Sequence, residues 1–228
     1  ERLLDYFRRE GMFSLNENKM AIKKQTVIEV AEELFLTQGL VATEMKEIAE
    51  RASISRSTLY RMFDSRESLA FFVADKCLHE LFDIKPLDTY GVNKTGFEIL
   101  CAYTNDLVGI MVEKRRYLKF LSEFDHLFIG DYPDTPEAHK FIEFNRQRHD
   151  RKMLMDILSI GVKDGSIRSD IDINMLELAI GNTLLGVAQR IVVREENYLQ
   201  EYGYGQEILY AVIELILNGV CASYTSAP

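Results

Sequence analysis

The sequence predicts an all-α protein, with an N-terminal three-helix helix-turn-helix head followed by a helical-bundle body. Hydrophobic residues make up 47% of the 228 residues, which is enough for a packed core. The chain has only 4 prolines and 13 glycines. Apolar residues recur at the three- and four-residue spacing of helices rather than alternating as they do in strands.

Charge divides the chain into two parts. The formal net charge is -9, yet residues 20–66 carry 7 basic and 7 acidic side chains, whereas the chain from Glu67 onward carries 16 basic and 25 acidic ones. A neutral segment joined to an acidic remainder favours a small DNA-contacting head, although an ordinary acidic protein has the same overall balance. We expect a helix-turn-helix domain at residues 20–66 and a second domain at residues 67–228.

Residues 1–19 form a separate segment. The chain does not begin with Met, and Met20-Ala21-Ile22-Lys23-Lys24 is typical of a natural start. On that interpretation residues 1–19 are an added extension. The alternative is a genuine extra helix.

The first two helices of the head are predicted from apolar spacing. The first covers residues 22–38 and ends at Gly39. It carries one apolar stripe, formed by Val27, Val30, Ala31 and Leu34. The second begins after Thr43, a favoured N-cap residue, and must be short because Ser53-Ile54-Ser55 interrupts it.

The third helix opens at Ser55, another N-cap residue. Leu59 and Phe63 are one turn apart and face inward. The outer side is then polar and basic, with Arg56, Ser57, Thr58, Tyr60 and Arg61. Asp64 and Glu67 fit a capping box that starts a fourth helix.

Two short helices joined by a tight turn, the second with a basic outer face, predict a helix-turn-helix. The residue types suit DNA. Arg bonds guanine O6 and N7 in a fork, and Ser, Thr and Tyr hydroxyls bond phosphates and fix the register. Arg66 near a helix N-terminus adds to the amide donors that favour phosphate there.

A pattern of fixed offsets runs through about 45 residues of this head: Ala31, Leu34-Phe35, Gly39, Thr43, Ile48-Ala49, Ala52-Ser53-Ile54-Ser55, Thr58-Leu59-Tyr60, Phe63, Arg66-Glu67 and Leu69. In these positions the chain resembles the TetR (tetracycline repressor) family. The resemblance implies that the third helix meets the major groove and its flanking phosphates through Ser55, Arg56, Ser57, Thr58, Tyr60 and Arg61. It also implies contacts from Thr43, Lys46 and Arg66 to the DNA backbone.

Two positions depart from the family pattern. Ser53 stands where the family often has Gly, and a non-Gly residue with positive φ costs roughly 1 kcal/mol. Met62 stands where the family often has His, so one usual polar contact is missing. The first departure predicts a slightly altered turn, and the second puts in doubt which bases are read.

The body is predicted to hold five further helices. Pro86 and Gly91 mark a break after the fourth helix, and the helical pattern resumes at Gly96. The expected helices cover residues 96–111, 117–128, 136–163, 172–194 and 206–220.

The helix at residues 206–220 is apolar on nearly all sides, so it should be buried on several sides, and it is too short to span a membrane. A second subunit is one way to bury it, and burial wholly within the monomer is the other. The resemblance implies a homodimer through the last two helices. The expected interface residues are Gly181, Gly186, Ile208, Val212, Ile213 and Ile216.

The resemblance also implies a ligand cavity in the body. The candidate pocket residues lie on the helices that surround a cavity in the family: Tyr103, Met111, Tyr117, Phe120, Phe124, Phe128, Phe144, Met153 and Asn182. Plain core packing is the alternative for each of them.

Other function classes find no support in the sequence. Cys77, Cys101 and Cys221 are isolated, as expected of reduced thiols in a cytoplasmic protein, and the four histidines have no metal-ligand spacing. We expect no cofactor and no metal site. No signal peptide or 18-residue apolar run is present, so we expect no membrane partner. The sequence lacks a nucleophile–base set and a phosphate-binding glycine loop, so we expect no enzyme.

The sequence therefore predicts a cytoplasmic, homodimeric, ligand-responsive repressor. Its partners would be a palindromic operator in double-stranded DNA and an unidentified small-molecule effector. Two alternatives stay open. One is a TetR-like DNA-binding protein without a small-molecule ligand, with an architectural or protein-partner role. The other is a transcriptional activator.

Overall fold

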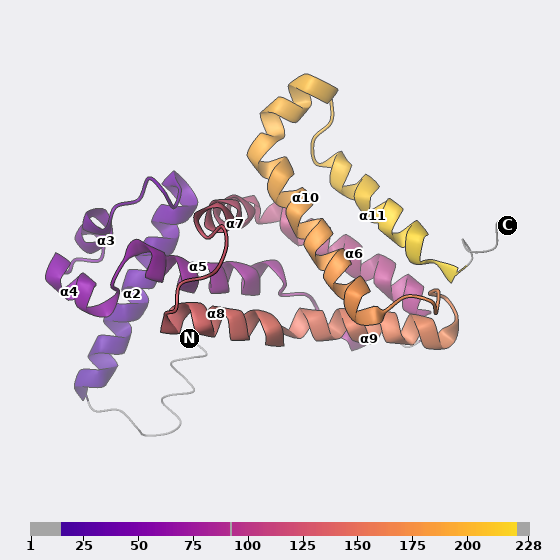
Figure 1. The fold of residues 1–228 in the computed structure, drawn as a ribbon, viewed down its shortest axis with the longest axis horizontal. Helices are drawn as coiled ribbons and strands as arrows, with labels where there is room; N and C mark the ends of the chain where they lie inside the picture. The colour runs from indigo at the N-terminus through magenta and orange to yellow at the C-terminus, as the bar shows by residue number, and fades with distance from the viewer. Residues whose placement is uncertain (1–14, 92, 223–228) are drawn as a thin grey trace. The chain divides into compact units, whose positions relative to one another are not determined.

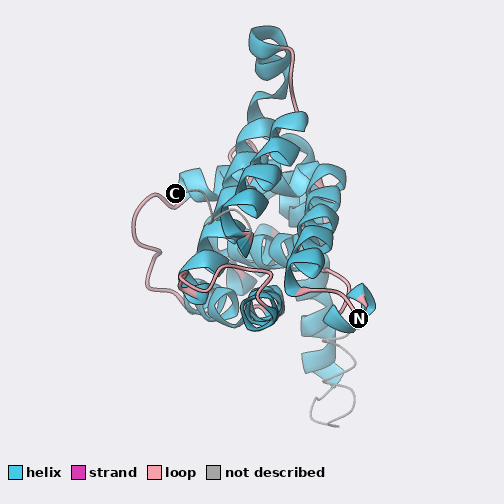
Figure 2. Ribbon diagram, turned by 90° about the vertical axis from the view of Figure 1, so that its right-hand side faces the viewer, coloured by secondary structure: helices cyan, strands magenta, loops and turns pink. Residues whose placement is uncertain are grey.

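The computed structural model describes residues 15–91 and 93–222. In this part of the chain the regular elements are helices (Figures 1 and 2), and Ile167 and Cys221 form one isolated β-bridge. The all-α fold class is confirmed. Two compact units are present, residues 1–73 and residues 74–228. Their boundary lies inside the fourth helix of the head, beyond the expected boundary at Arg66.

The N-terminal unit contains α2 (Leu15–Gln38), α3 (Met45–Arg51), α4 (Arg56–Met62) and the start of α5 (Arg66–Leu81). α2 begins seven residues before the predicted start, so it includes the end of the segment 1–19; residues 1–14 lie outside the described residues. Most of the predicted inward residues are confirmed, because Val27, Ala31, Leu34, Leu59 and Phe63 are buried; Val30 is half-exposed. The Lys24 ammonium lies over the Phe63 and Phe72 rings, 5.1 and 5.2 Å from their centroids.

Three helix starts were predicted from cap residues, and one is confirmed. The Ser55 hydroxyl accepts a hydrogen bond from the Thr58 N–H at the start of α4. Thr43 is not the N-cap of α3, because Glu44 holds that position. The capping box of Asp64 and Glu67 is also wrong: α5 begins at Arg66, and the Ser65 hydroxyl accepts from the Ser68 N–H. In both cases the helix begins one residue later than the predicted cap implies.

The C-terminal unit contains the end of α5 and a bundle of longer helices. These are the 3-10 helix η1 (Leu87–Tyr90), α6 (Gly96–Glu113), α7 (Arg115–Leu127), α8 (Pro136–Gln147), α9 (His149–Asp164), α10 (Ile173–Tyr202) and α11 (Glu207–Val220). The core forms where α6 packs on α9 and α10 packs on α7 and α9. α10 continues eight residues past the predicted end, to a left-handed Gly203.

The single helix predicted at residues 136–163 is wrong. Arg148 has φ -53° and ψ 134°, outside the helical region, and it separates α8 from α9. Its guanidinium makes a two-point ion pair with Asp150 and lies 4.0 Å from the centroid of the Phe82 ring. Phe82 belongs to another segment, so helical spacing within residues 136–163 cannot reveal its contact with Arg148.

Glycine is required at the crossing of α6 and α9. A Cβ on Gly96 would lie 2.1 Å from the Gly161 nitrogen. The close approach lets the Gly96 N–H donate to Asp164 Oδ2 over 2.7 Å and the Phe97 N–H donate to the Ser166 hydroxyl over 3.0 Å. These bonds satisfy amides at the N-terminus of α6, which lack partners within the helix.

Candidate nucleic-acid interface and effector pocket

The turn between α3 and α4 depends on one residue in the left-handed region. Ser53 has φ 54° and is the non-glycine residue with positive φ among the described residues. The Ser53 N–H donates to the Glu50 carbonyl and the Ile54 N–H to the Ala49 carbonyl. The predicted departure from glycine therefore falls at the position where glycine relieves strain.

α4 separates an apolar face from a polar one. Leu59 is fully buried, whereas Arg56, Ser57 and Arg61 are exposed and Tyr60 has 50% of its surface exposed. Ser55 is committed to the helix start, because its hydroxyl lies 2.8 Å from the Thr58 hydroxyl and 3.0 Å from the Ser57 hydroxyl. The side chains available to an external partner on α4 are therefore two arginines, a serine and a tyrosine.

A hollow of about 580 Å³ lies between α3, α4 and the start of α5. It brings together five of the nine residues expected to contact DNA: Thr43, Lys46, Arg56, Tyr60 and Arg66. Lys46 is exposed and pairs only loosely with Glu50, 3.8 Å away. Glu44, Asp64 and Glu67 also line the hollow, so its charge is mixed rather than purely basic.

Two of the expected DNA contacts are engaged within the unit. Thr43 is 1% exposed, and its hydroxyl donates to the Gly39 carbonyl over 2.7 Å. Arg66 Nη1 donates to the Val41 carbonyl over 2.8 Å, and Nη2 pairs with Glu67 over 3.0 Å. Arg66 thus ties the loop before α3 to the start of α5.

In the C-terminal unit a pocket of about 510 Å³ lies between the end of α5 and helices α7 to α10; we call it the body pocket. One wall is apolar and aromatic, formed by Leu78, Phe82, Leu121, Phe124, Tyr132 and Phe141. The Phe124 ring lies 5.2 Å from Phe141, and Tyr132 meets Phe141 edge-on at 5.8 Å. This wall suits an apolar or ring-bearing ligand.

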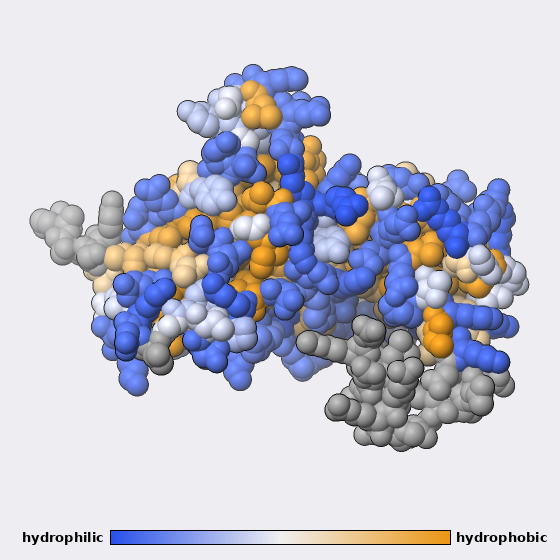
Figure 3. Space-filling view, turned by 180° about the vertical axis from the view of Figure 1, so that it is seen from behind, coloured by the Kyte–Doolittle hydropathy of each residue, from blue (hydrophilic) through white to orange (hydrophobic). Residues whose placement is uncertain are grey.

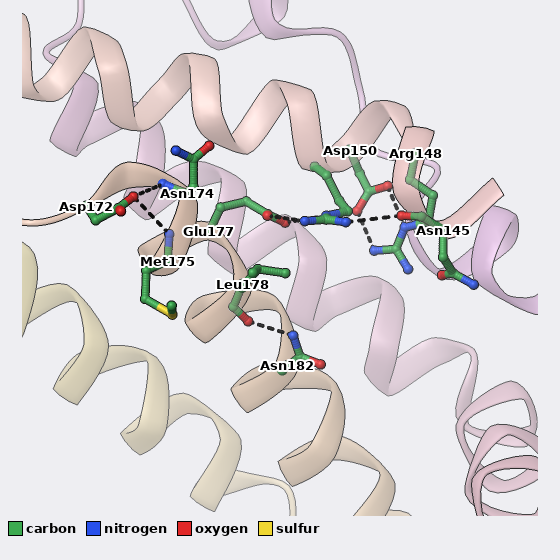
Figure 4. Close-up of polar contacts among 10 residues, drawn as sticks. Asn145, Arg148, Asp150, Asp172, Asn174, Met175, Glu177, Leu178 and Asn182 are labelled. Carbon is green, nitrogen blue, oxygen red and sulfur yellow. Dashed lines mark hydrogen bonds and ion pairs between the residues drawn. The ribbon is translucent and has the colours of Figure 1, made fainter. Parts of the chain in front are cut away.

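Other residues that line the body pocket form a polar wall, and their contacts are drawn in Figure 4. Arg151 Nε and Nη2 donate to the two oxygens of Glu177 over 3.0 and 2.8 Å, and Nη1 donates to the Asn145 carbonyl. The hydrogen bond from Arg151 to Glu177 raises the pKa of the guanidinium. Arg148 is paired with the buried Asp150 in the same way. Each guanidinium keeps N–H donors beyond those used by its carboxylate.

Asp125 adds an acidic group to the same wall. Desolvation raises its pKa above the ordinary value, although the hydrogen bond that Gln189 donates to Oδ2 over 2.9 Å acts in the opposite direction. Asn182 Nδ2 donates to the Leu178 carbonyl, which leaves the amide oxygen as an acceptor. Donors and acceptors are therefore both present on the polar wall.

Only two of the nine expected pocket residues line the body pocket: Phe124 and Asn182. Tyr103, Phe120 and Met153 are buried core residues, and Met111 borders a separate small cavity of about 20 Å³. Phe144 stacks on His79 at 4.2 Å, and Phe128 packs on Phe124 at 4.7 Å. Tyr117 does not line the body pocket either, and the Lys114 ammonium lies over its ring.

Hydrophobic side chains are also open to solvent on the two last helices, and the space-filling view shows apolar residues at the surface (Figure 3). The large exposed apolar residues of α10 and α11 include Met175, Leu178, Val193, Tyr210 and Leu215. Ile213 is buried within its own unit, whereas Ile208, Val212 and Ile216 are half-exposed. A Cβ built on Gly181 or Gly186 meets nothing within 4 Å, so the chain itself does not require glycine there.

Comparison with known proteins identifies the N-terminal unit. Residues 27–71 match the model of the bacterial regulatory proteins of the tetR family. The chain is also 29% identical over 173 residues to the HTH-type transcriptional repressor KstR2 of Mycolicibacterium smegmatis, covering 72% of this chain and 76% of that protein. The KstR2 of Rhodococcus jostii is 28% identical over 163 residues, 67% of this chain and 72% of that protein.

The chain belongs to the TetR family. It is a DNA-binding transcriptional regulator, and the members of this family are non-enzymatic DNA-binding proteins.

Solved structures show the same fold for this TetR-family chain. The ketosteroid transcriptional regulator KstR2 of Mycobacterium tuberculosis superposes with a TM-score of 0.53 at 20% identity, covering 87% of this chain and 94% of that one. A tetR-family regulatory protein from Rhodococcus RHA1 has a TM-score of 0.59 at 18% identity, covering 88% and 98%. The predicted arrangement of a helix-turn-helix head and a helical body is confirmed.

Sequence reasoning missed residues that the fold places at these sites. Arg148 and Arg151, at the start of α9, and Glu177 on α10 line the body pocket. Leu215 is 72% exposed, although it lies in a mostly apolar helix, between Glu214 and Ile216. The i, i+4 spacing of Gly181 and Leu185 on α10 was a usable signal for one side of the pocket, but its opposite side comes from residues more than thirty positions earlier in the chain.

Proposed function

We propose that this TetR-family chain is a cytoplasmic, homodimeric repressor that binds a palindromic operator and releases it when a small molecule occupies the body pocket. The observation that carries the proposal is the exposed face of α4, where Arg56, Ser57, Tyr60 and Arg61 lie opposite the buried Leu59. The naming of the KstR2 relatives as repressors supports repression as the direction of control.

On this proposal α4 is the recognition helix. Arg56 and Arg61 contact base edges, Ser57 and Tyr60 contact phosphates, and Lys46 on α3 contacts a flanking phosphate. Arg66 supports the loop before α3 instead of contacting DNA strongly, because its Nη1 bonds the Val41 carbonyl and its Nη2 pairs with Glu67. Thr43 contributes through its main chain, since its hydroxyl is buried and bonded.

Dimerisation is supported by the exposed apolar residues of α10 and α11. α10 is long and apolar enough, by length and composition alone, to span a membrane. Its Glu177 is buried, however, and is paired with Arg151 of α9, which holds this helix in the body of the unit. A second copy of the chain covers the remaining apolar face, because exposed apolar area of this kind is typical of protein interfaces.

The effector is proposed to be an apolar, ring-bearing compound with oxygen acceptors. The body pocket has the volume expected for small-molecule sites, which is roughly 300–1,000 Å³. Its aromatic wall packs against the rings, and the outer N–H groups of Arg148 and Arg151 donate to the oxygens. The solved M. tuberculosis relative is named a ketosteroid regulator, so a ketosteroid is the first probe.

Three measurements test the proposal. Selection from randomised DNA duplexes should yield a two-fold symmetric sequence, and sedimentation at micromolar concentration should give a dimer. Androstenedione should then displace a fluorescent apolar dye from the body pocket and release the selected duplex. Ile142→Trp, which enlarges a side chain of α8 that lines the body pocket, should keep DNA binding but block the dye. If the selected DNA sequences lack two-fold symmetry, or if sedimentation gives a monomer, the proposal of a dimeric repressor is wrong.

Two other results would replace parts of the proposal. If a panel of apolar ketones and acids leaves both the dye and the duplex bound, the chain acts on DNA without a small-molecule effector. If the expression of a reporter gene next to the selected operator increases when the protein is produced, the chain is an activator.

A further inference from the structure

Two cysteines that are far apart in the sequence converge on the turn at Ser166. Cys101 lies on α6 one helical turn after Phe97, and the Phe97 N–H donates to the Ser166 hydroxyl over 3.0 Å. Cys221 ends α11, and the N–H of the next residue, Ala222, donates to the Ser166 carbonyl over 3.2 Å. One residue therefore anchors the segments that carry both thiols.

Further contacts fix the two segments on this turn. Ile167 and Cys221 form an antiparallel bridge, and the Arg168 N–H donates to the Val220 carbonyl over 3.0 Å. At the other side the Gly96 N–H donates to Asp164 Oδ2 over 2.7 Å. α6 and α11 also pack directly on one another. The end of α11 and the first turns of α6 are thus held at a common site.

The environments of the three cysteines differ. Cys101 and Cys221 are half-buried and are not joined by a disulfide, whereas Cys77 is fully buried. Burial raises the pKa of the Cys101 thiol, and the charge of Cys221 raises it further. Two thiolates disfavour one another only when they are near, so this effect agrees with the hydrogen-bonded geometry.

We propose that Cys101 and Cys221 are a redox modification site that forms a reversible disulfide within one chain, tying the C-terminal end of α11 to α6. The oxidant is a peroxide. One thiolate attacks the peroxide O–O bond, giving a sulfenic acid and one water after proton uptake. The second thiolate attacks that sulfur, the S–S bond forms, and the hydroxide leaves as a second water. Two thiols and one hydrogen peroxide therefore give one disulfide and two waters, and a dithiol reverses the reaction by exchange.

The disulfide would close a loop of about 120 residues and so restrict the unfolded chain, which stabilises the folded unit. It does not depend on the proposed repressor function. The raised pKa of Cys101 makes the reaction slow near neutral pH and faster as pH rises, because the thiolate is the nucleophile.

The test treats the full-length protein with hydrogen peroxide, alkylates the remaining thiols and maps the peptides by mass spectrometry. Alkylatable cysteines should fall from three to one, with Cys101 and Cys221 in one linked peptide and Cys77 alkylated after unfolding. The matched variant Cys77→Ser should fall from two to none. Cys101→Ser and Cys221→Ser should each keep both remaining thiols.

A second measurement tests whether the disulfide between Cys101 and Cys221 stabilises the folded protein. The oxidised wild type should melt several degrees higher than the reduced protein, dithiothreitol should remove that increase, and Cys101→Ser should show none. The rate of linkage should rise between about pH 7 and pH 9. Linkage between two chains, accumulation of sulfinic acid at either position, or two thiols that survive oxidation in Cys77→Ser would each overturn the proposal.

Discussion

Arg151 of α9 and Glu177 of α10 meet in a two-point ion pair, with Nε to Oε1 at 3.0 Å and Nη2 to Oε2 at 2.8 Å. The carboxylate is 5% exposed and the guanidinium 29% exposed. The pair joins two helices at the wall of the body pocket. Buried pairs of this kind stabilise little relative to a well-packed apolar pair, but losing one partner is costly.

The single variants Glu177→Leu and Arg151→Met should therefore each destabilise the chain more than the double variant. We expect about 2–3 kcal/mol for Glu177→Leu, below the usual loss for a fully buried pair because Arg151 reaches solvent. Urea unfolding of the four proteins in the cycle measures the coupling. Additive single-variant effects would show that the pair contributes no mutual stabilisation.

Ser53 should be replaceable by Gly with a gain in stability. Its φ of 54° costs a non-glycine residue roughly 1 kcal/mol or more, partly offset by the greater freedom of Gly in the unfolded chain. We expect the free energy of unfolding to rise by about 0.5 kcal/mol. Ser53→Val should lower it. Thermal unfolding checks both, and an unchanged or lower stability for the Gly variant would mean that the serine side chain itself stabilises the turn.

Arg56→Ala and Arg61→Ala should change which DNA sequences are bound. Each arginine is exposed on α4, so each loss should cost about 1–3 kcal/mol in binding and relax one base position per half-site. Lys46→Ala should weaken binding to all sequences alike and reduce the salt slope by about one. Duplex selection at two salt concentrations separates these effects. Unchanged base preference in both arginine variants would remove α4 as the recognition helix.

The effect of replacing Arg66 should differ from that of replacing the arginines of α4. Because its guanidinium bonds the Val41 carbonyl and Glu67, Arg66→Met should lower the stability of the N-terminal unit as well as its DNA affinity. If Arg66→Met reduces the salt dependence of DNA binding without lowering the stability of the unit, Arg66 is a phosphate contact.

Leu215→Glu and Ile213→Glu should separate dimerisation from folding. Leu215 is 72% exposed, so a charge there should dissociate the dimer and leave a folded monomer. Ile213 is buried in its own unit, so Ile213→Glu should unfold the protein. The control is Ile129→Glu, at a 77% exposed position outside α10 and α11, which should stay dimeric. Sedimentation and circular dichroism give the readout; a dimeric Leu215→Glu protein would place the interface elsewhere.

Asp164 should contribute stability that depends on pH. Desolvation raises the pKa of its carboxyl, but hydrogen bonds from Ser166 and from the Gly96 N–H outweigh this, and the pKa lies below its ordinary value. A lowered folded-state pKa gives stability that is complete above the ordinary value of about 4 and is lost as pH falls through the lower folded-state value. Asp164→Asn should thus be less stable than wild type at pH 7, with the difference shrinking below about pH 4. Urea unfolding across that range tests the sign.

The sequence alone determined the helical class, the helix-turn-helix, the Ser55 cap and the outward face of α4. These features depend on neighbours within one or two turns, where helical periodicity decides which side chains share a face. It also located the strained turn, because Ser53 stands where glycine is expected.

Only the tertiary structure decided which residues of the body meet. Arg148, at the break between α8 and α9, contacts Phe82 of a distant segment, and of the six aromatic residues expected in the pocket only Phe124 lines it. In α11, apolar on nearly all sides, Ile213 is inside and Leu215 outside. Composition cannot make that choice, since burial of a wholly apolar helix is decided by the helices packed against it and not by its own pattern.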